Sequence, residues 1–87
     1  MEAERRLFEA MNSVIAERSR QDKKWGVQNH RPMVWLAILM EEVGEIAEAE
    51  LGLTFGDGLT EDLKKEITHT AAVALAMLEC GDRNGWW

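Results

Sequence analysis

Apolar residues recur at helical spacing in three separate stretches of the chain. They predict amphipathic helices over about residues 2–22, 32–53 and 60–80. In the first helix the repeating apolar positions are Leu7, Phe8, Met11, Val14 and Ile15. No stretch of useful length alternates between apolar and polar residues, as a strand does. The expected fold is therefore all-α, with three helices in a single domain over residues 1–87.

Proline and glycine mark the expected limits of these helices. Pro32 suits the first turn of a helix, because its φ angle is fixed and its missing N–H is not needed there. The segment TFGDGLT is typical of a turn, and Thr60 is the expected N-cap of the third helix. Gly81 fits a C-terminal cap. Because the turn is short, the second and third helices are expected to be antiparallel neighbours.

Composition and charge narrow the classes of function. The 87 residues include 16 acidic residues against 10 lysines and arginines, for a net charge of −6. No basic stripe is visible, so nucleic acid is not an expected partner. A membrane is not expected either, since the longest uncharged apolar run, residues 71–78, is too short to cross one. A single cysteine and an N-terminus without an apolar signal core favour a cytoplasmic protein.

The stretch LMEEVGEIAEAELG in the second helix carries five glutamates. At 100° per residue, four of them lie within an arc of about 120°, opposite the main apolar face. These four are Glu41, Glu42, Glu45 and Glu48. Such an arc is either a solvated face or a surface that binds a cation. Two observations favour the cation: no lysine or arginine four residues away offsets the repulsion, and Val34 and Ile38 continue the arc as an apolar stripe.

The third helix offers a complementary set of ligands. Glu66 and His69 are three residues apart and share one face, with Asp62 one turn before them. A histidine alone is more often a structural residue than a ligand, so His69 is a candidate because of Glu66. Glu66 lies at a depth from the turn similar to that of Glu42 and Glu45. The four residues Glu42, Glu45, Glu66 and His69 thus predict a site for a hard divalent cation, Mg²⁺ or Mn²⁺.

The second and third predicted helices, with the loop before them, resemble a known family. WLAILMEEVGEIAEAEL followed by KKEITHTAAVALAMLE is similar to the MazG-like, all-α nucleoside triphosphate pyrophosphohydrolases. Their hallmark is E-E-x-x-E on one helix and E-x-x-D on the next, which EEVGE and EITH match here except at His69. The loop RQDKKWGVQNH also resembles the family's Lys-Trp-Gly-x-Gln segment. Magnesium prefers oxygen ligands and manganese accepts imidazole better, so His69 in place of Asp bears on the choice of ion.

The resemblance implies a Mg²⁺-dependent enzyme that hydrolyses a nucleoside triphosphate to the monophosphate and pyrophosphate by means of a metal-activated water. It implies that Glu42, Glu45 and Glu66 hold the metal, with His69 in the fourth position. Glu41 is then a further ligand or the base for the water, so Glu41 and Glu42 are the expected catalytic residues. The resemblance also implies a homodimer or a dimer of dimers, which suits a short chain with 46% hydrophobic residues.

The loop before the second helix supplies candidates for substrate binding. Trp25 is expected either to stack on a base or to fill the gap between the first two helices. Gln28 is a candidate for reading the edge of the base. Lys23, Lys24 and Arg83 are candidates for contacts with phosphate.

Two other functions are consistent with the same residues. Glu66-x-x-His69 is half of a ferritin-like di-iron site, which a dimer would complete with Glu45. That reading leaves the Glu41–Glu42 pair and the Lys-Trp-Gly loop without a role. The chain is alternatively a non-catalytic helical interaction module, degenerate at His69.

Overall fold

Three long helices make up nearly the whole chain in the computed structural model, which describes residues 1–87. Helix α1 spans Glu2–Trp25, α2 spans Pro32–Phe55 and α3 spans Thr60–Asn84. There is no strand. None of the three helices has the length and apolar character that a membrane span requires. The prediction of an all-α chain with three helices is confirmed.

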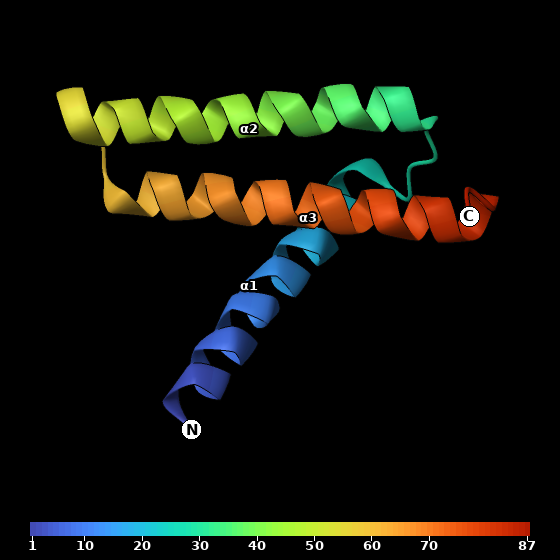
Figure 1. Cartoon of the computed structure of the whole chain (residues 1–87), viewed down its shortest axis with the longest axis horizontal. Helices are drawn as coiled ribbons and strands as arrows, with labels where there is room; N and C mark the ends of the chain where they lie inside the picture. The colour runs from blue at the N-terminus through green and yellow to red at the C-terminus, as the bar shows by residue number, and fades with distance from the viewer.

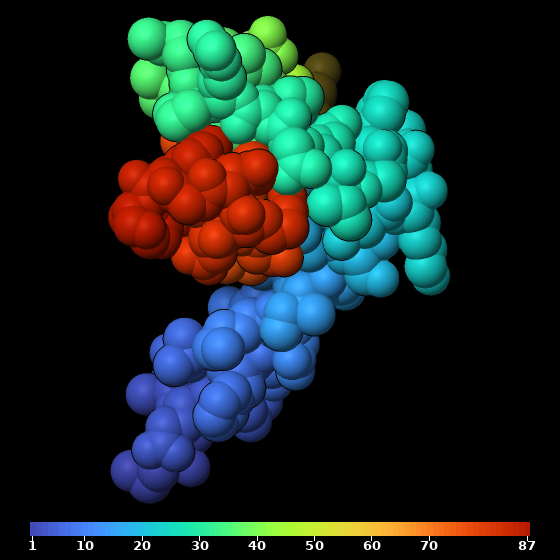
Figure 2. All heavy atoms as spheres, turned by 90° about the vertical axis from the view of Figure 1, so that its right-hand side faces the viewer, coloured from blue at the N-terminus to red at the C-terminus, as the bar shows by residue number.

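Helices α2 and α3 lie side by side and run in opposite directions, joined by a short turn (Figure 1). Helix α1 passes across α3 and contacts it, whereas α1 and α2 make no comparable contact (Figure 1). The N-terminal half of α1, in blue, extends away from the rest of the molecule (Figure 2). The result is an antiparallel helix pair with a third helix crossing it on the side of α3.

The hydrophobic core is small and lies between α2 and α3. It consists of Trp35 from α2 with Val73 and Cys80 from α3. Five half-buried residues surround these three: Ile38, Leu39, Ala76, Met77 and Trp86. Only 6 of the 87 residues are buried, so a single chain leaves most of its large apolar side chains exposed to solvent. A chain of this length buries only part of its apolar surface when it folds alone.

The turn between α2 and α3 depends on glycine. The N–H groups of Gly56 and Gly58 both donate to the carbonyl of Gly52, at 2.9 and 3.0 Å. A Cβ atom on Gly58 would lie 2.6 Å from the carbonyl carbon of Gly52, which is closer than atoms approach without displacement. The absence of a side chain at Gly58 therefore allows α3 to fold back tightly along α2.

The predicted first residues of the helices agree with the structure more closely than the predicted last residues do. Helix α2 begins at Pro32, as expected, but Thr60 is the first residue of α3 and makes no capping hydrogen bond. Helix α1 continues past the predicted end to Trp25, because Lys23 and Lys24 are compatible with the last helical turn and its dipole. Gly26, with φ of 75°, then ends the helix.

The prediction that Gly81 caps the third helix is wrong. Gly81 is buried within α3, where the indole ring of Trp87 packs against the position that a side chain would occupy. The helix continues to Asn84 and ends at Gly85, which has the left-handed conformation with φ of 68°. Helix α3 therefore runs about one turn past its predicted end at residue 80.

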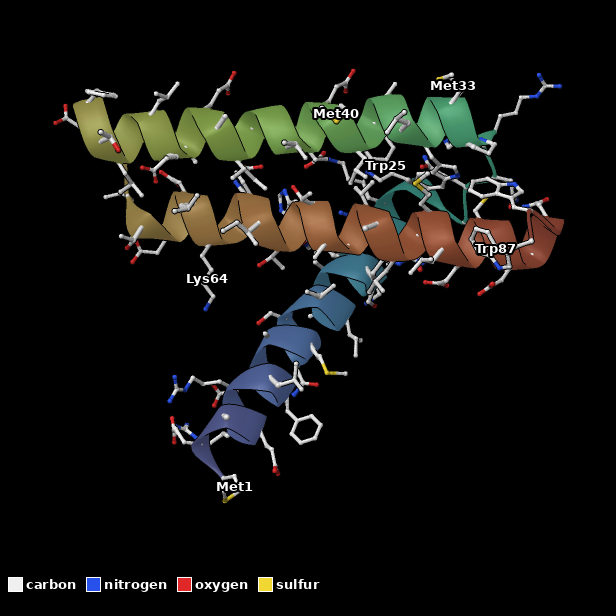
Figure 3. The ribbon with its side chains drawn as sticks, viewed as in Figure 1. Met1, Trp25, Met33, Met40, Lys64 and Trp87 are labelled. Atoms are coloured by element: carbon white, nitrogen blue, oxygen red, sulfur yellow. The ribbon has the colours of Figure 1, made fainter.

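The apolar faces expected to be buried are mostly exposed in the single chain. Helix α1 lies against α3 next to a groove lined by Ala10, Ser13 and Val14. Its larger apolar residues, Leu7, Phe8, Met11 and Ile15, are exposed by 45–58%. On α2 the side opposite α3 is also apolar and exposed, with Met33, Leu36, Met40 and Val43. Met33 lies on this outer side (Figure 3).

Candidate metal centre and adjoining groove

The core sets the positions of the acidic residues between α2 and α3. Glu42 lies seven residues, or two helical turns, after Trp35, and so it faces α3 as Trp35 does. Glu66 lies seven residues before Val73 and faces α2 for the same reason. His69 follows Glu66 by about one turn. One ligand atom from each of Glu42, Glu66 and His69 lies within 4.8 Å of the other two.

Two oxygen atoms in this cluster have no hydrogen-bond partner. They are Oε2 of Glu42 and Oε2 of Glu66, and both are buried. Burying a carboxylate oxygen without a partner costs free energy, and a cation is the partner that removes this cost. Two carboxylates and an imidazole form a donor set that suits a divalent ion such as Mn²⁺, and Mg²⁺ less well. The residues present therefore fit a divalent cation.

Two carboxyl groups of the site, those of Glu42 and Glu45, have a pKa raised above the ordinary value. Desolvation, followed by the nearby charge of Glu45, raises the pKa of Glu42, although His69 opposes this effect. A hydrogen bond with Glu66, followed by desolvation, raises the pKa of Glu45. Glu45 itself is exposed at the edge of the cluster. Neighbouring carboxylates add to both shifts, and for Glu45 the charge of Lys65 opposes them in part.

Helix α1 adds an acidic residue that the sequence analysis did not identify. Glu17 is buried, and its Oε2 atom lies 3.4 Å from Nε2 of His69. Arg20 donates to Oε1 of Glu17 through Nε at 2.9 Å, and Gln21 donates to Oε2 at 3.1 Å. The signal was available in principle, because Glu17 follows Val14 by one turn on the side of α1 that meets α3. It was missed because the larger apolar residues of α1 indicated a different face.

Glu41 and Glu48 lie apart from the cluster. Glu41 is exposed and does not belong to the group of residues that could hold an ion. Glu48 is also exposed and lines a shallow acidic groove with Glu45, Asp62 and Glu66. Of the four predicted ligands, the structure thus brings Glu42, Glu66 and His69 closest together and places Glu45 beside them.

A groove of about 320 Å³ runs along the C-terminal end of α1 and the following loop. Glu42 lines the groove, as do Trp25 and Gln28 from the predicted substrate segment. Trp35 and Ile38 contribute apolar surface from α2. The volume is at the lower end of the range found for small-molecule sites. Glu42 is therefore the residue that links the acidic cluster to a space with both apolar and polar walls.

The predicted phosphate ligands occupy different positions around this groove. Arg83 lines it, but its Nη2 atom donates to the carbonyl of Gln28 at 3.0 Å and to Oδ1 of Asn29 at 3.0 Å. Its guanidinium group therefore holds the loop in place. Lys24 lies with Nζ 4.8 Å from the ring centroid of Trp25, a cation–π contact. Lys23 is exposed and lies outside the groove.

Arg18 is a second residue of the groove that the sequence analysis did not identify. Its guanidinium group is largely buried and forms ion pairs with Asp22 at 2.8 Å and Glu79 at 2.9 Å. Desolvation lowers the pKa of Arg18, but hydrogen bonds to Glu79 and Asp22 outweigh it and raise the pKa overall. The pair with Glu79 joins α1 to α3, whereas the pair with Asp22 lies within α1.

Comparison of the chain with protein-family models, with curated proteins and with solved structures found no match.

Proposed function

We propose that the chain is a divalent-cation-dependent nucleoside triphosphate pyrophosphohydrolase of the MazG-like kind. The observation that carries the proposal is the pair of buried, unpartnered oxygens on Glu42 and Glu66 beside His69. Glu42 of this cluster also lines the groove that contains Trp25 and Gln28. A cation next to a cavity with an aromatic residue is an arrangement suited to a nucleotide, which has both a polyanion and a flat base.

In this proposal the acidic residues serve the phosphate chain. Glu42, Glu66 and His69 hold the cation, and Glu45 at the rim is a further ligand or accepts a proton from water. A bound divalent cation would neutralise part of the triphosphate charge and activate a water for attack on phosphorus. The raised pKa of Glu45 brings it closer to the range useful to a general base. Glu41, which the family resemblance favours for this role, is further from the cluster.

The groove then receives the nucleoside. Trp25, which is 62% exposed, offers a surface on which a base can stack, and Gln28 lies beside it in the groove. Lys24 is held near Trp25 and is the basic residue best placed to meet a phosphate. Arg83 acts on the substrate indirectly, since it fixes the loop that carries Gln28.

The same proposal includes a homodimer or a dimer of dimers in the cytoplasm. The exposed apolar residues of α1 and the outer face of α2 support it, because monomers rarely leave so much apolar surface in contact with water. A second copy that packs against these faces would supply the core that one chain lacks.

The test measures pyrophosphate release from a panel of common and modified dNTPs and NTPs, with Mg²⁺ or Mn²⁺. We expect at least one nucleotide to be hydrolysed, and Glu42→Gln and Glu66→Gln to lower kcat/KM by about 100-fold or more. Glu50→Gln is the matched control, because Glu50 is exposed and its carboxylate accepts from Thr54 at 2.7 Å, outside the cluster. No turnover of any nucleotide with either ion would contradict the proposal.

A second candidate function is a dimeric, carboxylate-bridged di-metal protein. The proximity of Glu66 and His69 on one face of α3 favours it, since this pair is the unit that ferritin-like sites repeat. Aerobic purification distinguishes the two: a bound iron pair with near-ultraviolet charge-transfer absorption, and no pyrophosphate release, would favour the di-metal protein. A chain that binds no ion and hydrolyses no nucleotide would instead be an interaction module.

A further inference from the structure

Glu17 is the one buried charged side chain in the protein, and the proposed function gives it no role. It belongs to α1, whereas the residues proposed to hold the ion belong to α2 and α3. A buried carboxylate is retained at a cost unless it has strong partners. Its two hydrogen-bond partners, Arg20 and Gln21, are neighbours on the same helix, and Nε2 of His69 lies close to it on α3.

The two ring nitrogens of His69 face different groups. Nε2 is directed toward α1 and lies 3.4 Å from Oε2 of Glu17. Nδ1 is directed toward the cluster and lies 3.8 Å from the unpartnered Oε2 of Glu66. A neutral imidazole carries one proton, so only one of these nitrogens is free to bind an ion. A group that accepts a hydrogen bond from Nε2 holds the proton there, and so leaves Nδ1 free to bind an ion.

We propose that Glu17 positions His69 as a ligand, by accepting the ring proton on Nε2 so that Nδ1 binds the divalent cation. This inference rests on the proposed function, because it needs the ion between Glu42 and Glu66. Histidines that bind metals almost always donate their other N–H group, often to a carboxylate, which fixes the ring and makes the ligand more basic. Glu17 is the carboxylate beside Nε2.

The position of Arg20 indicates that His69 changes its tautomer when an ion binds. Its Nη2 atom lies 3.1 Å from Nε2 of His69, and arginine can only donate, so in the ion-free protein Nε2 accepts and the proton is on Nδ1. When an ion binds, that proton is lost to water and one is taken up at Nε2, where Glu17 accepts it. Arg20 is 64% exposed, so it can leave Nε2 while it keeps its bond to Oε1 of Glu17.

The selectivity of the site follows from this assignment. With Nδ1 of His69 as a ligand, the donor set contains one nitrogen beside carboxylate oxygens. Mn²⁺ accepts imidazole more readily than Mg²⁺ does. We therefore expect the nucleotide-free protein to bind Mn²⁺ more tightly than Mg²⁺, and by a wider margin than His69→Asp, which restores an all-oxygen set.

The experiment measures the Mn²⁺ dissociation constant of the nucleotide-free protein by electron paramagnetic resonance. Four proteins are compared: the natural chain, Glu17→Gln, His69→Asp and the double variant. Glu17→Gln should weaken Mn²⁺ binding by about 10- to 100-fold in the natural background. In the His69→Asp background it should not weaken binding, because residue 69 then has no ring proton for Glu17 to accept. A merely structural role for Glu17 would weaken binding in both backgrounds.

A second measurement needs no variant of Glu17. In the Zn²⁺-loaded protein, which is diamagnetic, ¹⁵N nuclear magnetic resonance reports which nitrogen of His69 carries the proton, with His30 as the internal reference. We expect the proton on Nε2. A proton on Nδ1, or equal loss of affinity in both backgrounds, would overturn the role of Glu17 alone. Failure of the natural chain to bind Mn²⁺ would overturn the metal site and the proposed function with it.

Discussion

At the scale of single residues, Glu42 shows a conflict between stability and ion binding. Its carboxylate is half-buried, has an unpartnered oxygen and lies near three other acidic residues, which is unfavourable unless an ion is present. Two arginines of α1 near the site are already engaged, since Arg20 pairs with Glu17 and Arg18 pairs with Glu79. This arrangement lowers the stability of the ion-free fold, and a bound cation would remove that cost.

Replacing Glu42 by glutamine separates these two effects. At pH 7 with a chelator present, Glu42→Gln should raise the free energy of unfolding by about 0.5 kcal/mol, the scale of repulsion between neighbouring like charges. With Mn²⁺ present, the natural chain should gain stability and the variant should not, because binding to the folded state alone is what stabilises. Urea titrations with and without the ion measure both effects, and Glu50→Gln serves as the control. A variant that Mn²⁺ stabilises as strongly as it does the natural chain would contradict this role.

The raised pKa of Glu42 also gives a pH dependence of known sign. The folded, ion-free protein binds a proton at Glu42 more tightly than the unfolded chain does, so this contribution to stability is present at low pH. It is lost as the pH rises from the ordinary value of 4.5 through the raised pKa. Relative to Glu42→Gln, the natural chain should therefore gain stability when the pH falls from 7 toward 4.5.

Mn²⁺ should reverse the sign of this difference, because ion binding requires the deprotonated carboxylate. Urea titrations of both proteins across this pH range, with a chelator and then with Mn²⁺, provide the measurement. An identical pH profile for the two proteins in the chelator would show that Glu42 titrates as it does in the unfolded chain.

Trp25 tests whether the groove holds the base. Stacking of a base on an aromatic side chain contributes about 1–3 kcal/mol, so Trp25→Ala should raise KM for the preferred nucleotide by about tenfold or more. Trp25→Phe keeps an aromatic face and should restore most of the affinity. Because Trp25 is 62% exposed, neither variant should unfold the chain, which circular dichroism verifies. An unchanged KM in Trp25→Ala would assign Trp25 to packing alone.

At the scale of the helices, α2 is apolar on two sides. Trp35 and Ile38 face α3, whereas Met40 and Val43 lie on the exposed outer side. A helix in contact with one partner needs a single apolar stripe, so the second stripe indicates a second partner. The small core between α2 and α3 leads to the same conclusion.

A glutamate at Met40 tests this outer face. If a second copy covers it, Met40→Glu should convert the oligomer to monomers, because the buried charge would have no partner. Light scattering coupled to size-exclusion chromatography gives the mass. Lys64→Glu introduces the same residue on the side of α3 that points away from α2 and should leave the mass unchanged (Figure 3). If Met40→Glu has the mass of the natural chain, this face is not the interface.

At the scale of the whole molecule, the sequence was sufficient to predict that three helices form and that α2 and α3 pack against each other. Periodicity places Glu42 and Glu66 two turns from core residues, and a short turn brings them together. The packing of α1 could not be obtained in this way. Its large apolar residues are exposed and it lies against α3 near small ones, so the contact between Glu17 and His69 appears only in three dimensions.

The helix ends were less predictable for a physical reason. Glycine permits a cap but does not require one, and Gly81 is instead buried beneath the ring of Trp87. Gly81 is thus an interior residue of α3, and Gly85, with its left-handed conformation, ends the helix. The groove near Trp25 is likewise lined by an ion pair between α1 and α3, Arg18 with Glu79, which connects residues far apart in the sequence.

The position of the core has a consequence for local unfolding. Trp35, Val73 and Cys80 occupy the end of the α2–α3 pair that is remote from the turn, whereas Glu45 and Glu66 occupy the part nearer the turn. Backbone amides near the turn should therefore exchange hydrogen with solvent well before those around Val73. An ion bound between the helices should slow exchange near the turn most, as mass spectrometry of exchange with and without Mn²⁺ can establish. Equal protection along both helices would mean that the pair opens as one unit. Under the proposed function, we expect the concentration of the ion to set how long the half of the helix pair nearer the turn stays closed.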